Sequence, residues 1–246
     1  MNSKTVDKII ALNKDFYEAV GQDFSRTRQN PWKGWFELLP LIRKQFAGRN
    51  SISVLDIACG NGRFYDFLKN NLPEFNIEYM GLDNNESLLQ EARLKSLSGS
   101  VYYNIHNVIK DLDSAPGAFD LVVAFGITHH IPSNKLRKNW FLELSNKLNP
   151  SGLFVFTVWN YMKSNRSSRN IKPVPAEIDE QELEEGDYFI GWADTDAVRY
   201  VHDYSDREIL EALNPTGLTL QKNFKADGKN NELNEYRIYS KKKSLA

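Results

Sequence analysis

The sequence predicts an α/β fold built on a doubly wound, mostly parallel seven-stranded sheet. Apolar runs of strand length alternate with segments of helical spacing, and a glycine turn joins the first run to its helix. Two runs near the C-terminus can close the sheet as an antiparallel pair. The chain has 246 residues, enough for one such domain with additions. We expect a helical substrate-entry segment over residues 1–50 and the core over residues 51–246.

Two helices are expected ahead of the core, because apolar residues recur at helical spacing from Val6 to Val20 and from Trp35 to Ile42. The core strands are expected at Ser53–Ile57, Ile77–Asp83, Ser100–Asn104, Phe119–Phe125 and Leu153–Trp159. The helices between them are expected at Gly62–Asn71, Asn85–Leu97 and Lys135–Leu148. Alternation of this kind gives parallel strands, whose carboxyl ends share one edge of the sheet.

The chain changes character after Trp159. A polar and basic stretch, Met162 to Val174, is followed by an acidic run from Glu177 to Asp187. We expect an inserted lid or loop over about residues 160–200, because long loops inside compact domains are often functional. The remaining elements are expected to be a helix at Asp206–Leu213 and an antiparallel pair, Leu218–Phe224 and Tyr236–Lys241.

The composition is that of an ordinary soluble globular protein, with 41% hydrophobic and 26% charged residues. No apolar run is long enough to span a bilayer, and the N-terminus lacks the apolar centre of a signal peptide. The single cysteine, Cys59, fits a reducing cytoplasm. The formal net charge of −1 neither indicates nor excludes a nucleic-acid partner. The four histidines lack metal-ligand spacing, so no metal site is expected.

The glycine turn predicts a site for a nucleoside cofactor. Gly60 and Gly62 carry no Cβ, so a ligand can approach the backbone N–H groups at the start of the following helix. About twenty residues further on, the next strand ends at Asp83, where a carboxylate can accept hydrogen bonds from ribose hydroxyls. Asp56 lies inside the first strand end, where a carboxylate repels a pyrophosphate and suits a cationic amino group.

This pattern, Asp56-x-Ala58-x-Gly60-x-Gly62, resembles the first motif of the class I S-adenosylmethionine-dependent methyltransferases, which have a Rossmann-like fold. Ala58 stands where that family often has glycine, and we expect it to keep a negative φ. The resemblance implies S-adenosylmethionine as the cofactor. The candidate cofactor-binding residues are Asp56, Ala58, Gly60, Gly62, Asp83, Asn84, Asn107, Val108 and Phe125.

Three further blocks supply candidates for the substrate side. The buried strand after Phe119 runs into a loop with His129 and His130, at the sheet edge where ligands bind. Near the N-terminus, arginine stands beside aromatic residues and a proline turn, and the same pairing of arginine with aromatics returns late in the chain. A solvated loop whose Trp32 packs the helix on the core would also explain the N-terminal block, and packing of a lid on the core would explain the late block equally well. Their candidate residues are Tyr17, Arg28, Trp32, Trp192, Arg199, Tyr200 and His202.

Taken together, these blocks resemble the tRNA wobble-uridine methyltransferases, which methylate the carboxylate of 5-carboxymethyluridine. The matching residues are Phe24-Ser25, Thr27-Arg28, Pro31-Trp32, Asp56 to Gly62, Asp83, Ile127 to Ile131, Arg199-Tyr200 and His202. The resemblance runs from about Tyr17 to the C-terminus. It departs at Gly191, where the family tends to have proline, and at Asn160-Tyr161, where acidic and glutamine residues are usual.

The resemblance implies methyl transfer to a carboxylate that is already ionised at neutral pH. It implies catalytic roles for Arg28, His129, Arg199 and His202, and a base pocket shaped by Tyr17, Trp32, His130, Trp192 and Tyr200. It also implies the tRNA anticodon region as a partner, with a small zinc-binding activator protein in some relatives. Two alternatives stay open: a small-molecule O- or C-methyltransferase, and a non-catalytic protein that binds S-adenosylmethionine and regulates a partner.

Overall fold

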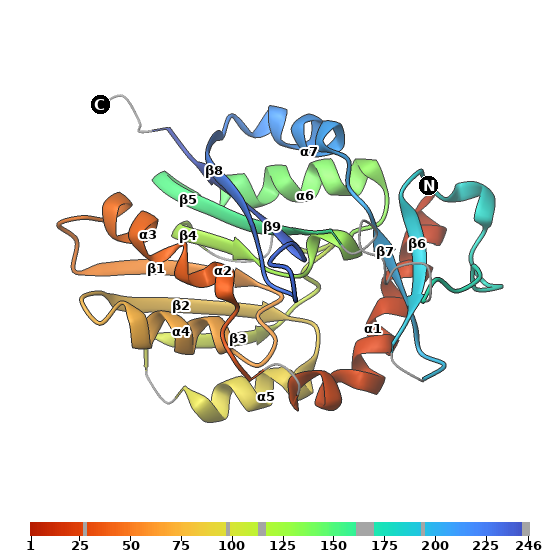
Figure 1. Ribbon diagram of the computed structural model, residues 1–246, viewed down its shortest axis with the longest axis horizontal. Coiled ribbons are helices and arrows are strands. Elements are labelled where there is room, and N and C mark those ends of the chain that lie inside the picture. The colour runs from red at the N-terminus through yellow and green to blue at the C-terminus, as the bar shows by residue number, and fades with distance from the viewer. Residues whose placement is uncertain (27–28, 97–98, 113–116, 161–169, 193–194, 243–246) are drawn as a thin grey trace.

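A computed structural model describes residues 1–26, 29–96, 99–112, 117–160, 170–192 and 195–242. The sheet crosses the middle of the molecule, with α6 and α7 on its upper side and α4 and α5 below, and α1 stands beside the β6–β7 hairpin at one end (Figure 1). The helices are α1 Ser3–Arg26, α2 Lys33–Phe36, α3 Leu39–Gln45, α4 Arg63–Asn71, α5 Glu86–Lys95, α6 Asn134–Asn146 and α7 Asp206–Leu213. The strands are β1 Ser51–Ile57, β2 Asn76–Asp83, β3 Val101–Ile105, β4 Phe119–Ala124, β5 Leu148–Trp159, β6 Asp187–Gly191, β7 Val198–His202, β8 Thr219–Ala226 and β9 Asn234–Ser240.

The main sheet has seven strands in the order β3-β2-β1-β4-β5-β9-β8. The pairs from β3 to β5 are parallel, while β9 is antiparallel to both β5 and β8. This confirms the predicted sheet and its antiparallel C-terminal pair. The chain order reverses between β1 and β4, and in open α/β sheets ligands bind in the crevice beside such a reversal, at the carboxyl ends of the strands.

Both faces of the sheet are buried under helices. Successive side chains of its central strands point to opposite faces, so each strand contributes to both layers. Val54 of β1 packs with α3 and α4, whereas its neighbour Leu55 packs with α6 and α7. In β4, Leu121 and Val122 divide in the same way. The near-continuous apolar runs that identified these strands therefore reflect two hydrophobic layers.

The region expected to be a lid contains a second, two-stranded sheet, formed by the antiparallel pair β6 and β7. The hairpin packs against α1, where Ile9 is buried with Phe189 and Tyr200. The prediction of a loop was wrong for these residues, because the short strands are defined by their pairing and by their contact with α1. The basic stretch from Met162 to Arg169 lies outside the described residues.

Across the parts of the chain that the structure describes, no helix is long and apolar enough to cross a membrane.

Candidate active site

The glycine turn connects β1 to α4 through residues in the left-handed region. Gly60 has φ 54° and Gly62, the N-cap of α4, has φ 76°. A Cβ on Gly62 would lie 2.6 Å from the hydroxyl oxygen of Tyr103, so only glycine fits there. Ala58 has φ 61°, which corrects the expectation of a negative φ. The bend of the turn imposes this conformation, although it costs a residue with a Cβ about 1 kcal/mol.

Asp83 closes the turn from the neighbouring strand end. Its Oδ2 accepts a hydrogen bond from the backbone N–H of Gly60 at 2.8 Å, and its Oδ1 accepts one from Asn85 at 2.9 Å. Burial raises the pKa of this carboxyl above its ordinary value, while these backbone donors oppose the rise. Asn85 also caps α5 by accepting from Leu88 N–H. Asp83 therefore holds the turn and the start of α5 in a fixed relation.

Asp56 lies beneath the turn, and only 2% of its surface is exposed. The hydroxyl of Tyr79 donates a hydrogen bond to its carboxylate. Burial raises the pKa of Asp56 to about 7, Asp83 adds to the rise, and Tyr79 and Arg63 oppose it. Asp56 is not among the residues that line either cavity described below.

The first cavity opens above the turn and holds about 970 Å³ of empty space, the open solvent at its mouth included. Asp83, Asn84 and Asn85 bring polar groups to it, and Leu88, Val108 and Ile109 give it an apolar side. Six of the candidate cofactor-binding residues line it: Ala58, Gly60, Asp83, Asn84, Val108 and Phe125. Of the others, Gly62 faces Tyr103 and Ala92, and the Asn107 side chain accepts from the backbone N–H groups of Ile109 and Lys110.

Helix α1 forms another wall of this cavity. Ile10, Asn13, Tyr17 and Ser25 all line it. Near the end of α1, the Ser25 hydroxyl donates to Glu91 at 2.7 Å and accepts from the Asn61 side chain at 2.9 Å, which fastens the helix to the glycine turn. The N-terminal helix is therefore part of the site.

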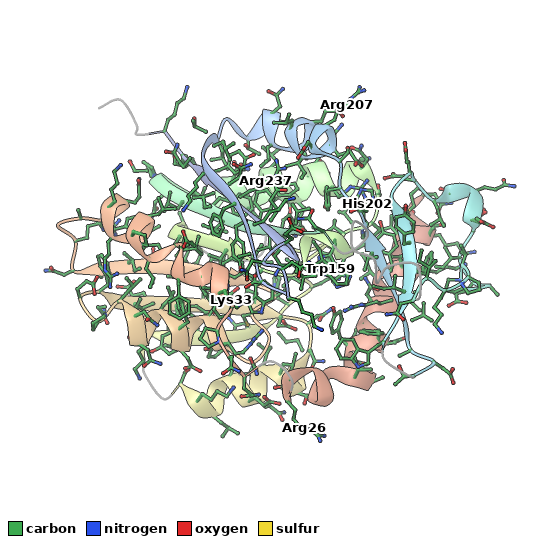
Figure 2. The ribbon with its side chains drawn as sticks, in the orientation of Figure 1. Arg26, Lys33, Trp159, His202, Arg207 and Arg237 are labelled. Carbon is green, nitrogen blue, oxygen red and sulfur yellow. The ribbon has the colours of Figure 1, made fainter. Side chains whose placement is uncertain are left out.

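A second cavity adjoins the first. Both are lined by Tyr17, Trp32, Arg63 and Gly126, so they share a wall. The further lining residues of the second cavity include His129, Trp159, Arg199, Asp227 and Asn234. In Figure 2, Trp159 and Lys33, another lining residue, lie near the centre of the view. The carboxyl end of β5 thus meets the loop after β4, the β8–β9 turn and β7.

Arg199 is the buried cation of the second cavity, and it is 5% exposed. Its guanidinium carbon lies 5.0 Å from the ring centroid of Phe16 and 5.2 Å from that of Trp159. Its Nη1 donates to the Tyr17 hydroxyl at 2.8 Å, while its Nε–H has no hydrogen-bond partner in the part of the chain that the structure describes. Within the described residues no carboxylate forms an ion pair with Arg199. Because a buried charge is costly unless it is paired, an anionic ligand in this cavity would be strongly favoured.

The two histidines of the loop after β4 are neutral. Burial lowers the pKa of His130 to about 3 and lowers that of His129 well below its ordinary value, with the charge of Arg199 contributing in both cases. His129 lines the second cavity and lies beside Trp159, with 4.7 Å between the ring centroids and 36° between the ring planes. Its Nδ1 has no hydrogen-bond partner among the described residues. His130 lines the first cavity.

Three candidates on the substrate side, Trp192, Tyr200 and His202, line neither cavity. His202 and Tyr200 are buried in a polar cluster, where Asp187 accepts from His202 Nδ1 at 2.7 Å and from the Tyr200 hydroxyl at 2.6 Å. Figure 2 shows His202 on β7, on the side of the molecule that carries α7. The ring centroid of Trp192 lies 5.8 Å from the guanidinium carbon of Arg199. A fourth candidate, Arg28, lies outside the described residues.

Several lining residues were missed by the sequence analysis. Trp159 could have been found, because it stands at the carboxyl end of a core strand, and so could Asn85, two residues after Asp83. Asn13 gives a weaker signal, a polar residue within the apolar stripe of a helix. No sequence pattern marks Asp227 and Asn234, because the fold of the β8–β9 turn brings them to the cavity.

Comparison with known proteins agrees with this geometry. Residues 54–152 match a family described as a methyltransferase domain. A protein of Encephalitozoon cuniculi that is named a methyltransferase is 28% identical over 204 residues, which cover 82% of this chain and 84% of that one. The chain is an S-adenosylmethionine-dependent methyltransferase.

Two other comparisons are more distant. The methyltransferase is 25% identical over 167 residues to tRNA (carboxymethyluridine(34)-5-O)-methyltransferase ALKBH8 of Macaca fascicularis, and the match covers 63% of this chain but only 23% of ALKBH8. A solved methyltransferase of Burkholderia thailandensis, which acts on 1,6-didemethyltoxoflavin and holds S-adenosylhomocysteine, has a TM-score of 0.65 at 14% identity. That match covers 96% of this chain and 90% of the other, and it shows the shared fold.

The residues of the first cavity fit S-adenosylmethionine, the cofactor of this methyltransferase. A Cβ built on Gly60 would have only the Leu88 side chain nearby, at 3.9 Å, so the turn leaves open space beside its backbone. Asp83, Asn84 and Asn85 offer hydrogen-bonding groups for a ribose, and Val108 with Ile109 offers an apolar surface for a base.

Proposed function

We propose that this methyltransferase esterifies a carboxylate, and that its acceptor is 5-carboxymethyluridine at the wobble position of tRNA. The observation that carries the proposal is Arg199, a buried guanidinium in the second cavity without an acidic partner among the described residues. A carboxylate supplies the missing charge and can accept two N–H donors of arginine at once. The partial similarity to ALKBH8 supports the nucleoside part of the proposal.

The rest of the second cavity is compatible with a nucleobase. Trp32 and Trp159 provide aromatic surfaces on which a splayed-out base can stack. Lys33 and Arg63 also line this cavity and can attract the phosphates beside the base. The anticodon region of tRNA is therefore the proposed partner. The family resemblance adds a small zinc-binding activator protein as a second proposed partner.

Little acid–base chemistry is required of the protein on this proposal. S-adenosylmethionine, when bound, supplies a methyl group activated by its positive sulfonium. The acceptor carboxylate is ionised at neutral pH, so no side chain has to remove a proton from it. Arg199 would orient the carboxylate, and the neutral His129 and Trp159 would exclude water around it.

The proposal is tested with an RNA anticodon stem-loop that carries 5-carboxymethyluridine. The protein is incubated with this RNA and S-adenosylmethionine, and the nucleosides are analysed by mass spectrometry. We expect the methyl ester on this RNA and no product on the same stem-loop with unmodified uridine. Arg199→Gln should lower kcat/KM by about tenfold to a hundredfold, the effect of losing a hydrogen bond to a charged group, and should keep cofactor affinity.

Other results would contradict the proposal. Methylation of a small acid or phenol, with none of the RNA, would make the protein a small-molecule methyltransferase. Cofactor binding in calorimetry without methylation of RNA or of any such small molecule, with and without an activator protein, would favour a regulatory protein. Loss of cofactor binding in Arg199→Gln would mean that Arg199 serves the first cavity.

A further inference from the structure

The hydroxyl of Tyr17 connects the two cavities. Its oxygen lies 2.8 Å from Arg199 Nη1 and 2.7 Å from His130 Nε2, and Tyr17 lines both cavities. Among the described residues, the rings of Phe16, Trp159 and Trp192 also lie around the guanidinium. Aromatic rings attract a cation but do not fix the direction of its N–H donors. The Tyr17 hydroxyl is therefore placed to orient Arg199.

The hydrogen bonds of His130 determine which way the hydroxyl points. His130 Nδ1 lies 2.9 Å from the carbonyl oxygen of Tyr200 and 3.2 Å from the side-chain nitrogen of Asn13, which also donates to that carbonyl. We assign the hydrogen of the neutral ring to Nδ1 on the shorter contact, since an unprotonated Nδ1 would set a lone pair against the carbonyl oxygen, and Nε2 is then an acceptor. The Tyr17 O–H donates to Nε2, which leaves the lone pairs of its oxygen for Arg199.

The backbone of Tyr17 is tied to the cofactor side. Its carbonyl oxygen accepts a hydrogen bond from the Asn85 side chain at 2.9 Å. The backbone N–H of Asn85 in turn donates to Asp83, which holds the glycine turn. A continuous series of contacts thus runs from the first cavity through α1 to the guanidinium in the second.

We propose that Tyr17 is a positioning residue that aims the Arg199 guanidinium at the acceptor carboxylate. The inference rests on the proposed function insofar as Arg199 binds that carboxylate. On this proposal the Tyr17 hydroxyl contributes to the binding of the acceptor. It does not contribute to the binding of the cofactor, although Tyr17 lines both cavities.

Kinetics of Tyr17→Phe test the proposal, with Tyr102→Phe as the matched control at an exposed strand residue. We expect Tyr17→Phe to raise KM for the carboxymethyluridine stem-loop about tenfold and to leave the Kd of S-adenosylhomocysteine within about twofold. In the Arg199→Lys background the same change should have no further effect, because Tyr17 acts through Arg199. The proposal would be overturned if the two single-variant increases in KM multiply in the double variant. It would also be overturned if Tyr17→Phe weakens the binding of S-adenosylhomocysteine and leaves KM for the stem-loop unchanged.

A spectroscopic measurement tests the same point without the acceptor. The Arg199 Nε–H resonance is identified in ¹⁵N-labelled protein by its absence from Arg199→Lys. Tyr17→Phe should shift or broaden this resonance, and Tyr102→Phe should leave it unchanged. An unaltered resonance in Tyr17→Phe would show that the hydroxyl does not orient the guanidinium. If the wild type fails to methylate the stem-loop, the proposed function is wrong. The Arg199 Nε–H resonance then still tests whether the Tyr17 hydroxyl orients the guanidinium.

Discussion

His130 couples the acid stability of the protein to the wall of its active site. In the folded chain its pKa is about 3 because of burial, whereas an accessible histidine titrates near 6.5. Below about pH 6.5 the unfolded chain therefore binds a proton that the folded chain does not. The contribution of the neutral, buried His130 to stability is complete above pH 6.5 and is lost progressively as the pH falls towards 3.

We expect the free energy of unfolding to decrease by about 2 kcal/mol between pH 7 and pH 5 on account of His130 alone. Urea unfolding at several pH values measures this decrease. His130→Asn should have a shallower dependence on pH, because asparagine does not titrate. An equally steep decrease in His130→Asn would show that other groups cause the acid sensitivity.

Single residues also mark how far the sequence could predict the site. Gly60 and Asp83 could be placed, because a turn and a strand end fix them relative to the sheet edge. Ala58 was expected at negative φ, and its value of 61° is set by the complete turn instead. Arg199 could be named as a candidate, but that no acidic partner stands beside it among the described residues depends on the three-dimensional packing.

At the level of elements, the β6–β7 hairpin explains why neighbouring candidates separated. Side chains alternate along a strand, so Arg199 points to one side of β7 while Tyr200 and His202 point to the other. Asp187 of β6 lies on the same face of the hairpin as Tyr200 and His202, and it accepts a hydrogen bond from each of them. Since the strand was not recognised from the sequence, this division could not be foreseen.

The segment before β6 is fastened to α6 by Glu184. Its carboxylate accepts from Arg137 at 2.7 Å and from the backbone N–H of Asn134 at 2.8 Å, at the start of α6. Arg137 is buried, with 3% of its side chain exposed, and its other carboxylate neighbour, Glu208, is 3.5 Å away. The contact therefore pairs a buried charge and also satisfies a helix terminus.

Glu184→Ala should lower the free energy of unfolding by about 3 kcal/mol, because it leaves Arg137 incompletely paired. Chemical denaturation measures the change. Glu185→Ala is the control, since this adjacent side chain is exposed and its loss should change stability by less than about 0.5 kcal/mol. A loss in Glu184→Ala no larger than in this control would show that Glu208 alone neutralises Arg137.

For the whole molecule, local patterns predicted the sheet and the cofactor side better than the substrate side. Each of the strands β1, β2 and β4 has its own apolar run, so each could be recognised from a local stretch of the sequence. The second cavity instead combines Tyr17, Trp159, Arg199 and Asp227, which the fold collects from four separate regions. Such a combination leaves no local signature, and only the family resemblance had grouped some of its members.

This long-range construction has a consequence for how the protein acquires its activity. The hydrogen bond between Arg199 and Tyr17 joins residues 182 positions apart, and that between Tyr200 and Asn13 spans 187. Contacts of such separation are slow to form, so we expect the central sheet to assemble first. In refolding from urea, far-ultraviolet circular dichroism should recover before the binding of S-adenosylhomocysteine. Simultaneous recovery would mean that α1 docks together with the sheet. If binding recovers later, a newly made molecule has no working site until the β6–β7 hairpin packs against α1.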